Sequence, residues 1–398
     1  VPVPPLSVPT DASEDSQPEI AALETNEAVR LFVERYRAKQ PGFELTEHNA
    51  PMITEICARL DGLPLAIELA AAHASLYSPA GLLERLQPRL PLLNAGPRDL
   101  PSRQQTMQDT IRWSYELLSE AERSAFRRLS VFVGGCTIEA AATVCGGVSS
   151  GDGPPDHQHA RPDDISAVLE SLSGQSLIHI DTTALNGMPR LTMLETVREF
   201  AVQELIASGE VDVARRDHAA CYLGFMLRAE RTYWGDAPGD QSATLDIEIG
   251  NLRTALAWAT EHGETDTALR LASAVFDPFW IFDPQWQVSN NARELRTWTR
   301  RALAMPGGSP PNRVAALVSA ACLAEARGDI AESHALVDQA ITLAHAHGDG
   351  LGLATASFVR GRAAYREGDI ATSRRLLTDA LSGFRARDAR GRAAWALC

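Results

Sequence analysis

Two matching stretches, AEARGDIA at residues 324–331 and AYREGDIA at residues 364–371, decide the fold of this sequence. They are offset by 40 residues, and a serine, a leucine and an alanine that follow the first stretch recur at the same offset (Ser333 and Ser373, Leu336 and Leu376, Ala340 and Ala380). In each stretch the Gly-Asp pair predicts a tight turn, because glycine tolerates a left-handed backbone and aspartate caps the helix that follows. A fixed period of this length indicates stacked helical hairpins, which we expect over residues 308–398.

Residues 209–307, which precede the hairpins, show only the periodicity of helices. The clearest apolar stripe runs through Leu245, Ile249, Leu252 and Leu256, so we expect a helical sensor region here. Within it, residues 277–286 concentrate aromatic side chains, which either line a ligand or partner pocket or fill gaps between irregular helices.

Residues 101–208 have a different pattern, in which short strands join the helices. Ser119 and Glu122 form a capping-box sequence at the start of one helix, and Thr137 is placed to cap another. The predicted order is helix (107–118), helix (119–129), strand (131–133), helix (137–144), helix (165–172), two strands (177–180 and 190–193) joined across Asn186-Gly187, and a closing helix (195–206). Residues 146–162 are rich in Gly, Pro and Ser and predict a flexible insertion. This order of elements is that of a winged helix.

Residues 21–100 predict a small helical bundle that follows an extended connector at residues 1–20. One apolar stripe runs from Val29 to Tyr36, a second follows the cap-like Asn49, and Pro64 opens a third helix, because proline is accepted in a first helical turn. A leucine-rich stretch at residues 82–93 completes the bundle. The predicted fold class is therefore mainly α: a helical bundle, a winged helix with a short β-hairpin, and TPR-like α-helical repeats.

The charge of the chain argues against binding to nucleic acid. With 51 acidic and 37 basic side chains the formal net charge is −14, which repels a phosphate backbone. The segment that would be the recognition helix of the winged helix, residues 163–172, carries three carboxylates and no basic residue. We therefore expect no direct contact between this chain and DNA.

Several other classes of site are also absent from the sequence. The six cysteines lack metal-ligand spacing and are expected to be reduced thiols in the cytoplasm, and no apolar run is long enough to span a membrane. The only lysine, Lys39, has no preceding glycines that could cradle phosphates, so the chain has no P-loop. We expect no catalytic residues and no metal. Because the chain begins at Val1 without methionine, we expect it to be a piece of a longer protein.

Three ordered parts of the sequence resemble one protein family. The run GLPLAIE at residues 62–68 resembles the GLPL motif of NB-ARC-type STAND NTPases. Residues 105–118, 131–135 and 193–201 look like the winged helix of large bacterial members, and NLRTALAW at residues 251–258 looks like the start of their helical sensor region. The chain is in this way similar to LuxR-type or antibiotic-regulator-type bacterial transcriptional regulators over nearly all its length. The resemblance implies that a P-loop core precedes the GLPL bundle in the full-length protein.

The resemblance also implies that Gly62, Leu63 and Pro64 face a nucleotide. In the family the loop that carries the proline lies against the adenine, where a rigid ring without an N–H donor suits the base. Considered alone, Pro64 is better explained as the residue that starts a helix. The resemblance decides between the two in favour of the nucleotide.

A second nucleotide-facing motif is implied at Met193, Leu194 and Glu195. These residues occupy the family's Met-His-Asp motif, whose histidine reads the β-phosphate of ADP. Leucine cannot donate a hydrogen bond to phosphate. Either phosphate sensing has moved to a neighbour such as Arg198, or the resting state is held in another way. A simpler role is also open to Glu195, since an acidic residue in a first helical turn complements the helix dipole.

Together the patterns and the resemblance predict the regulatory part of a nucleotide-dependent STAND signalling switch, within a transcriptional regulator. ATP or ADP is expected only in the full-length protein with its P-loop core, and no cofactor is expected for this chain alone. The expected partners are that core, a protein or small-molecule inducer on the repeats, and further copies in a nucleotide-dependent oligomer. The alternative is an interaction scaffold of TPR-like repeats in which the nucleotide contacts are vestigial.

Overall fold

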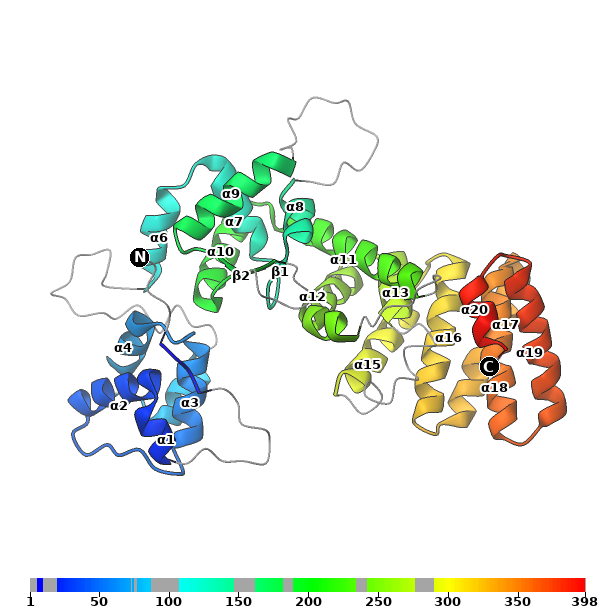
Figure 1. Cartoon of the computed structure of the whole chain (residues 1–398), viewed down its shortest axis with the longest axis horizontal. Helices are drawn as coiled ribbons and strands as arrows, with labels where there is room; N and C mark the ends of the chain where they lie inside the picture. The colour runs from blue at the N-terminus through cyan, green and yellow to red at the C-terminus, as the bar shows by residue number, and fades with distance from the viewer. Residues whose placement is uncertain are drawn as a thin grey trace. The chain divides into compact units, whose positions relative to one another are not determined.

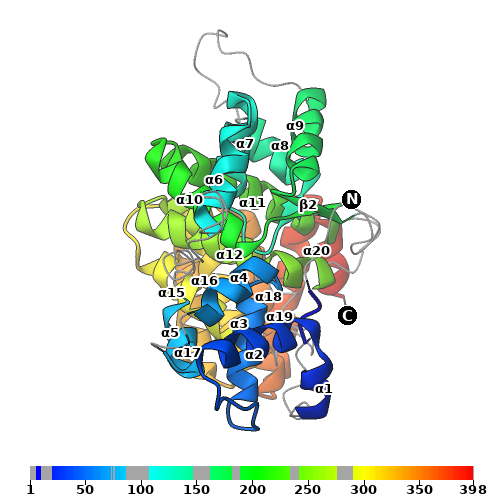
Figure 2. The same cartoon turned by 90° about the vertical axis from the view of Figure 1, so that its left-hand side faces the viewer.

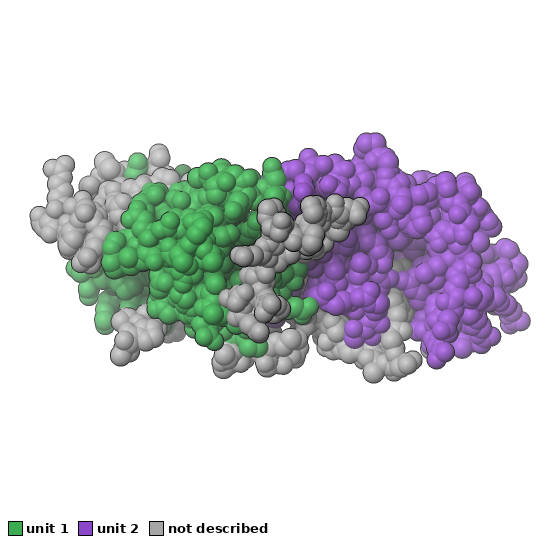
Figure 3. All heavy atoms as spheres, turned by 90° about the horizontal axis from the view of Figure 1, so that it is seen from above, with its two compact units in different colours: residues 1–214 green, residues 215–398 purple. Residues whose placement is uncertain are grey.

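The computed structural model describes residues 6–9, 20–72, 74, 77–86, 107–146, 162–181, 189–233, 242–275 and 290–397. Several predicted features lie wholly or largely outside these residues: most of the connector, the leucine-rich stretch beyond residue 86, the insertion at 146–162, the Asn186-Gly187 turn and the aromatic segment at 277–286. The chain divides into two compact units, residues 1–214 and 215–398 (Figure 3). The finer division into five parts remains a prediction.

The N-terminal part of the first unit is a bundle of short helices, drawn in blue in Figures 1 and 2. They are α1 (Ile20–Thr25), α2 (Glu27–Lys39), α3 (Ala50–Arg59), α4 (Pro64–Ala72) and α5 (Pro79–Arg85). The predicted stripe from Val29 to Tyr36 is buried on α2, which packs against α3 and α4. Asn49 does not cap α3 as predicted, because its side chain accepts from the Thr46 N–H and donates to the Glu44 carbonyl in the preceding turn.

The second part of the first unit has the helices of a winged helix: α6 (Met107–Glu116), α7 (Glu120–Leu129), α8 (Ile138–Gly146), α9 (Pro162–Gly174) and α10 (Glu195–Ala207). The capping box of Ser119 and Glu122 is present at the start of α7, as predicted. Rings from α6, α7 and α10 meet in the core, with 5.6 Å between the centroids of Tyr115 and Phe126 and 5.7 Å between those of Tyr115 and Phe200. This aromatic contact fixes α10 against the other two helices.

The small sheet of the winged helix begins later in the chain than predicted. Its strands are β1 (Cys136–Thr137), β2 (His179–Asp181) and β3 (Arg190–Thr192), antiparallel in the order β1-β3-β2. The predicted strand at residues 131–133 is wrong: Val131 and Phe132 donate their N–H groups back to carbonyls of α7 in a turn. Gly134 and Gly135, with φ of 75° and 90°, then redirect the chain, so pairing with β3 starts only at Cys136.

The second unit starts within α11 (Val211–Tyr233) and continues through α12 (Ser242–Glu261), α13 (Thr265–Val275) and α15 (Asn290–Ala304). A buried polar network joins α11 to α12. The Glu248 carboxylate accepts from the Tyr222 hydroxyl at 2.6 Å and from the Asn251 amide at 2.8 Å, and Asn251 Oδ1 lies 3.3 Å from His218 Nε2. Burial lowers the pKa of His218 to about 4, so its imidazole is neutral at pH 7.

The repeat prediction is confirmed by the remaining helices, which are drawn from yellow to red in Figure 1: α16 (Pro310–Ala326), α17 (Ile330–His347), α18 (Gly350–Arg366), α19 (Ile370–Arg385) and α20 (Arg390–Trp395). Successive helices from α16 to α20 pack on one another. Gly328 and Gly368 have φ of 78° and 83°, as the tight turns require. Asp329 caps α17 by accepting from the Glu332 N–H, and Asp369 caps α19 in the same way.

The predicted fold class, mainly α with a short β-hairpin and helical repeats, is thereby confirmed. Among the helices that the structure describes, none combines the length and the apolar character needed to cross a bilayer.

Candidate functional site

The loop between α3 and α4, which carries the GLPL motif, has a strained left-handed backbone. Asp61 and Gly62 have φ of 55° and 64°, and the Gly62 carbonyl accepts a hydrogen bond of 2.9 Å from the N–H of Leu6. A Cβ atom on Gly62 would overlap the Leu6 carbonyl oxygen. Only glycine therefore fits here, where a segment from the start of the chain lies against the loop.

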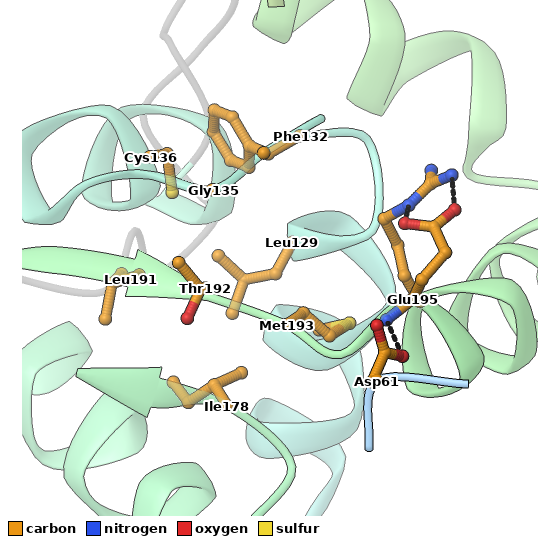
Figure 4. A pocket seen from close by; sticks show the side chains of 12 residues that line it. Asp61, Leu129, Phe132, Gly135, Cys136, Ile178, Leu191, Thr192, Met193 and Glu195 are labelled. Carbon is orange, nitrogen blue, oxygen red and sulfur yellow. Dashed lines mark hydrogen bonds and ion pairs between the residues drawn. The ribbon is translucent and has the colours of Figure 1, made fainter. Parts of the chain in front are cut away.

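Asp61 connects this loop to the start of α10. Its carboxylate accepts a 3.0 Å hydrogen bond from the backbone N–H of Glu195, the first residue of that helix (Figure 4). First-turn N–H groups have no acceptor within their own helix, and a carboxylate at this end complements the helix dipole. Leu194 occupies the N-cap position but offers no side-chain cap. Asp61 thus performs across 134 residues of sequence the capping that the local chain lacks.

Arg198, one turn along α10, is held by Glu195. Its Nε donates to Glu195 Oε2 at 2.8 Å, its Nη2 pairs with the other carboxylate oxygen, and its Nη1 donates to the Ser130 carbonyl at 3.2 Å. The hydrogen bonds and charge of Glu195 raise the pKa of Arg198, against the opposing effect of its partial burial. The guanidinium is therefore a permanent cation.

A cavity of about 320 Å³ lies beside these side chains. Its lining comes from the α3–α4 loop, the end of α7 and the turn after it, the sheet, and the start of α10: Asp61, Leu129, Phe132, Gly134, Gly135, Cys136, Ile178, Leu191, Thr192, Met193, Glu195 and Arg198. The side chains shown in Figure 4 come from these elements. The wall is thus apolar on the sheet side and charged at the start of α10.

The cavity brings together three of the residues that the resemblance singles out: Met193, Glu195 and Arg198. Leu194 is half-buried next to them but does not line the cavity. The GLPL residues lie apart from the lining, with Gly62 buried and Pro64 exposed at the first position of α4. The helix-starting role of Pro64 is thus realised, and its contact with adenine remains a prediction.

Asp61 is the residue of this site that the sequence analysis missed. The available signal is an aspartate next to a glycine just before the helix that Pro64 opens, since aspartate tolerates the left-handed conformation better than most residues. Nothing local, however, points to its partner at Glu195.

The charges at the cavity set what it can bind. Asp61 and Glu195 contribute two negative charges and Arg198 one positive charge, and the positive charge is occupied by Glu195. A phosphate group would be repelled by this arrangement unless Arg198 turned away from Glu195. The residues therefore fit a phosphate only if the arginine changes partner.

Comparison with known proteins gives relatives along most of the chain. A protein from Mycobacterium tuberculosis (strain ATCC 25618 / H37Rv), provisionally named an HTH-type transcriptional regulator, is 38% identical over 262 residues, which are 65% of this chain and 27% of that protein. The counterpart from Mycobacterium bovis matches equally. The chain is similar to these two mycobacterial proteins over about two thirds of its own length. This confirms the resemblance to large bacterial regulators, of which the chain spans about a quarter of the length.

Two further comparisons complete these findings. An uncharacterized protein from Mycobacterium tuberculosis is 34% identical over 188 residues, 47% of this chain and 45% of that protein. The chain also matches a crystal structure of a STAND protein with a tetratricopeptide repeat sensor from Pyrococcus horikoshii. The match covers 93% of this chain and 62% of the Pyrococcus chain, at 14% identity. The TM-score of this match is 0.26. No protein-family model matches the chain.

Proposed function

We propose that this chain is the regulatory part of a STAND-type transcriptional regulator, in which nucleotide state and signal binding are coupled. The chain has no catalytic role of its own in this proposal. Its helical bundle and winged helix complete a nucleotide site on a P-loop core elsewhere in the full-length protein, and its repeats receive the signal. We place the protein in the cytoplasm.

One observation carries the proposal: the GLPL loop and the Met193 to Glu195 segment meet directly, through the hydrogen bond from the Glu195 N–H to the Asp61 carboxylate. In the family that the sequence resembles, these two motifs face one nucleotide. The hydrogen bond caps α10 and joins two segments that lie 134 residues apart in the sequence. Their contact supports a shared role.

Arg198 supplies the element that can report the nucleotide. It pairs with Glu195 in the structure described, and it is the cation at the cavity that a β-phosphate of ADP could recruit. In the proposed switch, Arg198 exchanges the Glu195 carboxylate for phosphate when ADP is bound. Nucleotide and signal then act by biasing two arrangements of the same residues. Nucleotide-dependent assembly of several copies is part of this proposal.

The acidic α9 supports an output that does not run through this winged helix. Asp163, Asp164 and Glu170 are carried by the helix that would enter a DNA groove. DNA binding by the regulator is therefore assigned to another part of the full-length protein. The competing function, an interaction scaffold with vestigial nucleotide contacts, is favoured by the absence of a histidine at Leu194.

Nucleotide analysis of the full-length protein separates these functions. We expect the purified protein to carry ADP, detectable by chromatography after denaturation, and we expect Pro64→Ala to reduce the occupancy without loss of helical content. The matched control is Pro79→Ala, which removes a proline from the first position of α5 in the same bundle. If the wild-type protein holds no nucleotide and binds none in calorimetry, the scaffold function replaces the switch.

A further inference from the structure

The second unit contains a cavity of about 300 Å³ whose wall combines buried charges with apolar side chains. It lies among α11, α13, α16, α18 and α20, and its apolar side is formed mainly by one face of α16, with Pro311, Val314, Ala315 and Val318. Leu351 from α18 faces the same space. A volume of this size lies at the lower end of the range for small-molecule sites.

Glu230 of α11 stands at the charged side of the cavity between two arginines. Its Oε2 accepts from Arg270 of α13 at 2.7 Å, and its Oε1 accepts from Arg392 of α20 at 2.8 Å. Glu230 and Arg392 are 13% and 14% exposed, and Arg270 is 28% exposed, so solvent reaches the group mainly at Arg270. We call these three residues the Glu230 clamp.

The clamp shows that the two guanidinium groups are spaced to receive one carboxylate. Each oxygen of Glu230 serves one arginine, which is the arrangement a ligand carboxylate would need to reproduce. Arg392 is further fixed by its hydrogen bond of 3.2 Å to the Thr355 hydroxyl, which lines the same cavity. The site is therefore preorganised, and Glu230 occupies the position of the anion.

Charge around the clamp favours an anionic ligand. A neighbouring cavity shares the clamp residues and adds Arg231, Asp388 and Arg390 to the wall. Across the two cavities four arginines face three carboxylates, and one of these, Asp349, is bound to the first turn of α18 as its cap. This local excess of positive charge stands out in a chain whose net charge is −14.

From these contacts we infer that the cavity binds a small molecule that carries a carboxylate on an apolar body. The carboxylate takes the place of Glu230 on Arg270 and Arg392, and the body lies along Val314 and Val318 of α16. This inference rests on the proposed function in one respect: it names the chemical class of the signal that the repeats receive.

The position of the clamp gives such a ligand a mechanical effect. Glu230 belongs to α11, the helix that begins in the first unit at Val211 and enters the second unit after Ala214. In the structure, Glu230 connects the end of α11 to Arg270 of α13 and to Arg392 of α20. A carboxylate ligand that binds Arg270 and Arg392 displaces Glu230 from both arginines. Ligand binding therefore removes the contacts by which Glu230 holds the end of α11.

Ligand-observed NMR on the 398-residue chain tests the inference with hexanoate and benzoate as probes. We expect both acids to bind with a Kd on the order of 1 mM, as is usual for fragment-sized ligands, while hexanamide and benzamide do not bind. Arg270→Gln should weaken binding about tenfold, the effect of losing one charge-assisted hydrogen bond. Arg374→Gln, which removes an exposed arginine of α19 outside both cavities, should change nothing.

The decisive variant is Glu230→Gln, because it should tighten binding of the two acids about tenfold by removing the competing charge. A merely structural clamp would give the opposite result, since loss of the ion pairs would loosen the cavity. The inference is overturned if Glu230→Gln, folded by circular dichroism, binds the acids no better than wild type. It is also overturned if the amides bind as well as the acids, or if inorganic phosphate binds and the acids do not.

Should Glu230→Gln not fold, the comparison of Arg270→Gln with Arg374→Gln still decides, since equal binding by the two excludes the clamp as the site. None of these measurements involves nucleotide. A negative result in the ligand-binding experiments therefore does not contradict the proposed nucleotide switch. In the same way, a full-length protein that carries no ADP does not contradict the proposed ligand site.

Discussion

Replacing Asp61 by alanine removes the hydrogen bond between the GLPL loop and α10, and its cost can be worked from the structure. Loss of a helix-capping acceptor costs about 0.5–2 kcal/mol, and loss of a negative charge at a helix N-terminus about 0.3–1 kcal/mol. Asp61 also has a φ of 55°, and alanine tolerates that conformation worse, by about 1 kcal/mol. We expect Asp61→Ala to lower the free energy of unfolding of the first unit by about 2–4 kcal/mol.

Two variants separate these contributions. Asp61→Asn keeps an oxygen acceptor and tolerates the left-handed backbone, so it should cost only about 0.3–1 kcal/mol, for the lost charge. Asp388→Ala changes an aspartate with a similar φ of 52° whose carboxylate contacts the exposed Arg390, so it should report the backbone cost of about 1 kcal/mol. Urea unfolding monitored by circular dichroism gives the three values.

Hydrogen exchange locates the effect. The N–H of Glu195 has no acceptor within its helix, so its protection should fall in Asp61→Ala but not in Asp388→Ala. Mass spectrometry of a peptide that begins near Met193 resolves this change. The reasoning is refuted if Asp61→Ala is no less stable than Asp388→Ala and exchange at the start of α10 is unaltered.

Three further predictions concern other parts of the chain. Burial lowers the pKa of His218 to about 4, so its imidazole stays neutral in the folded protein, whereas in the unfolded chain it takes up a proton below pH 6.5. The free energy of unfolding should therefore be highest above pH 6.5 and should fall by about 3 kcal/mol toward pH 4. His218→Gln should lose less stability than wild type in urea unfolding between pH 7 and pH 4.5, and an equal loss would contradict the assignment. Gly368→Val should lower the free energy of unfolding by about 1–2 kcal/mol, because φ at this position is 83°, although the space around the Cβ position is open. Hydrogen exchange should increase in α18 and α19 and stay unchanged in the winged helix. Unchanged stability would contradict the left-handed turn. In a gel shift at physiological salt the chain should not bind duplex DNA, because α9 is acidic. Sub-micromolar binding that weakens as salt is added would contradict this, since it would require a basic surface elsewhere on the chain.

Local signals in the sequence were sufficient to predict most of the helices and their boundaries. The capping box at Ser119 and the turns at Gly328 and Gly368 depend on residues within four positions of each other. The local sequence is therefore enough to predict them. The stacking of hairpins followed in the same way from the repeat of 40 residues.

The first strand of the winged helix could not be placed correctly from propensity. Val131 and Phe132 have strong β-propensity, yet both are buried in the turn after α7. Their apolar character serves the core rather than the sheet. Gly134 and Gly135, which follow, have positive φ values that direct the chain into the strand at Cys136.

Neither charged group that organises the two cavities could be predicted. Asp61 meets Glu195 across 134 residues, and Glu230 meets Arg392 across 162 residues. Such pairs have no period or spacing in the sequence, because they result from the packing of whole elements. The resemblance located Met193 and Arg198 at one of these sites, but it could not show that Arg198 is held by Glu195.

The central claim, that Arg198 exchanges Glu195 for a nucleotide phosphate, is tested most directly by the rate at which the full-length protein releases ADP. The variants are Arg198→Gln and Glu195→Gln, compared with wild type by following displacement of a fluorescent ADP analogue. The account predicts opposite effects: faster release when Arg198 is removed, and slower release when Glu195 no longer competes for it, each by about tenfold for one charge-assisted hydrogen bond. Release at the wild-type rate in both variants would contradict it.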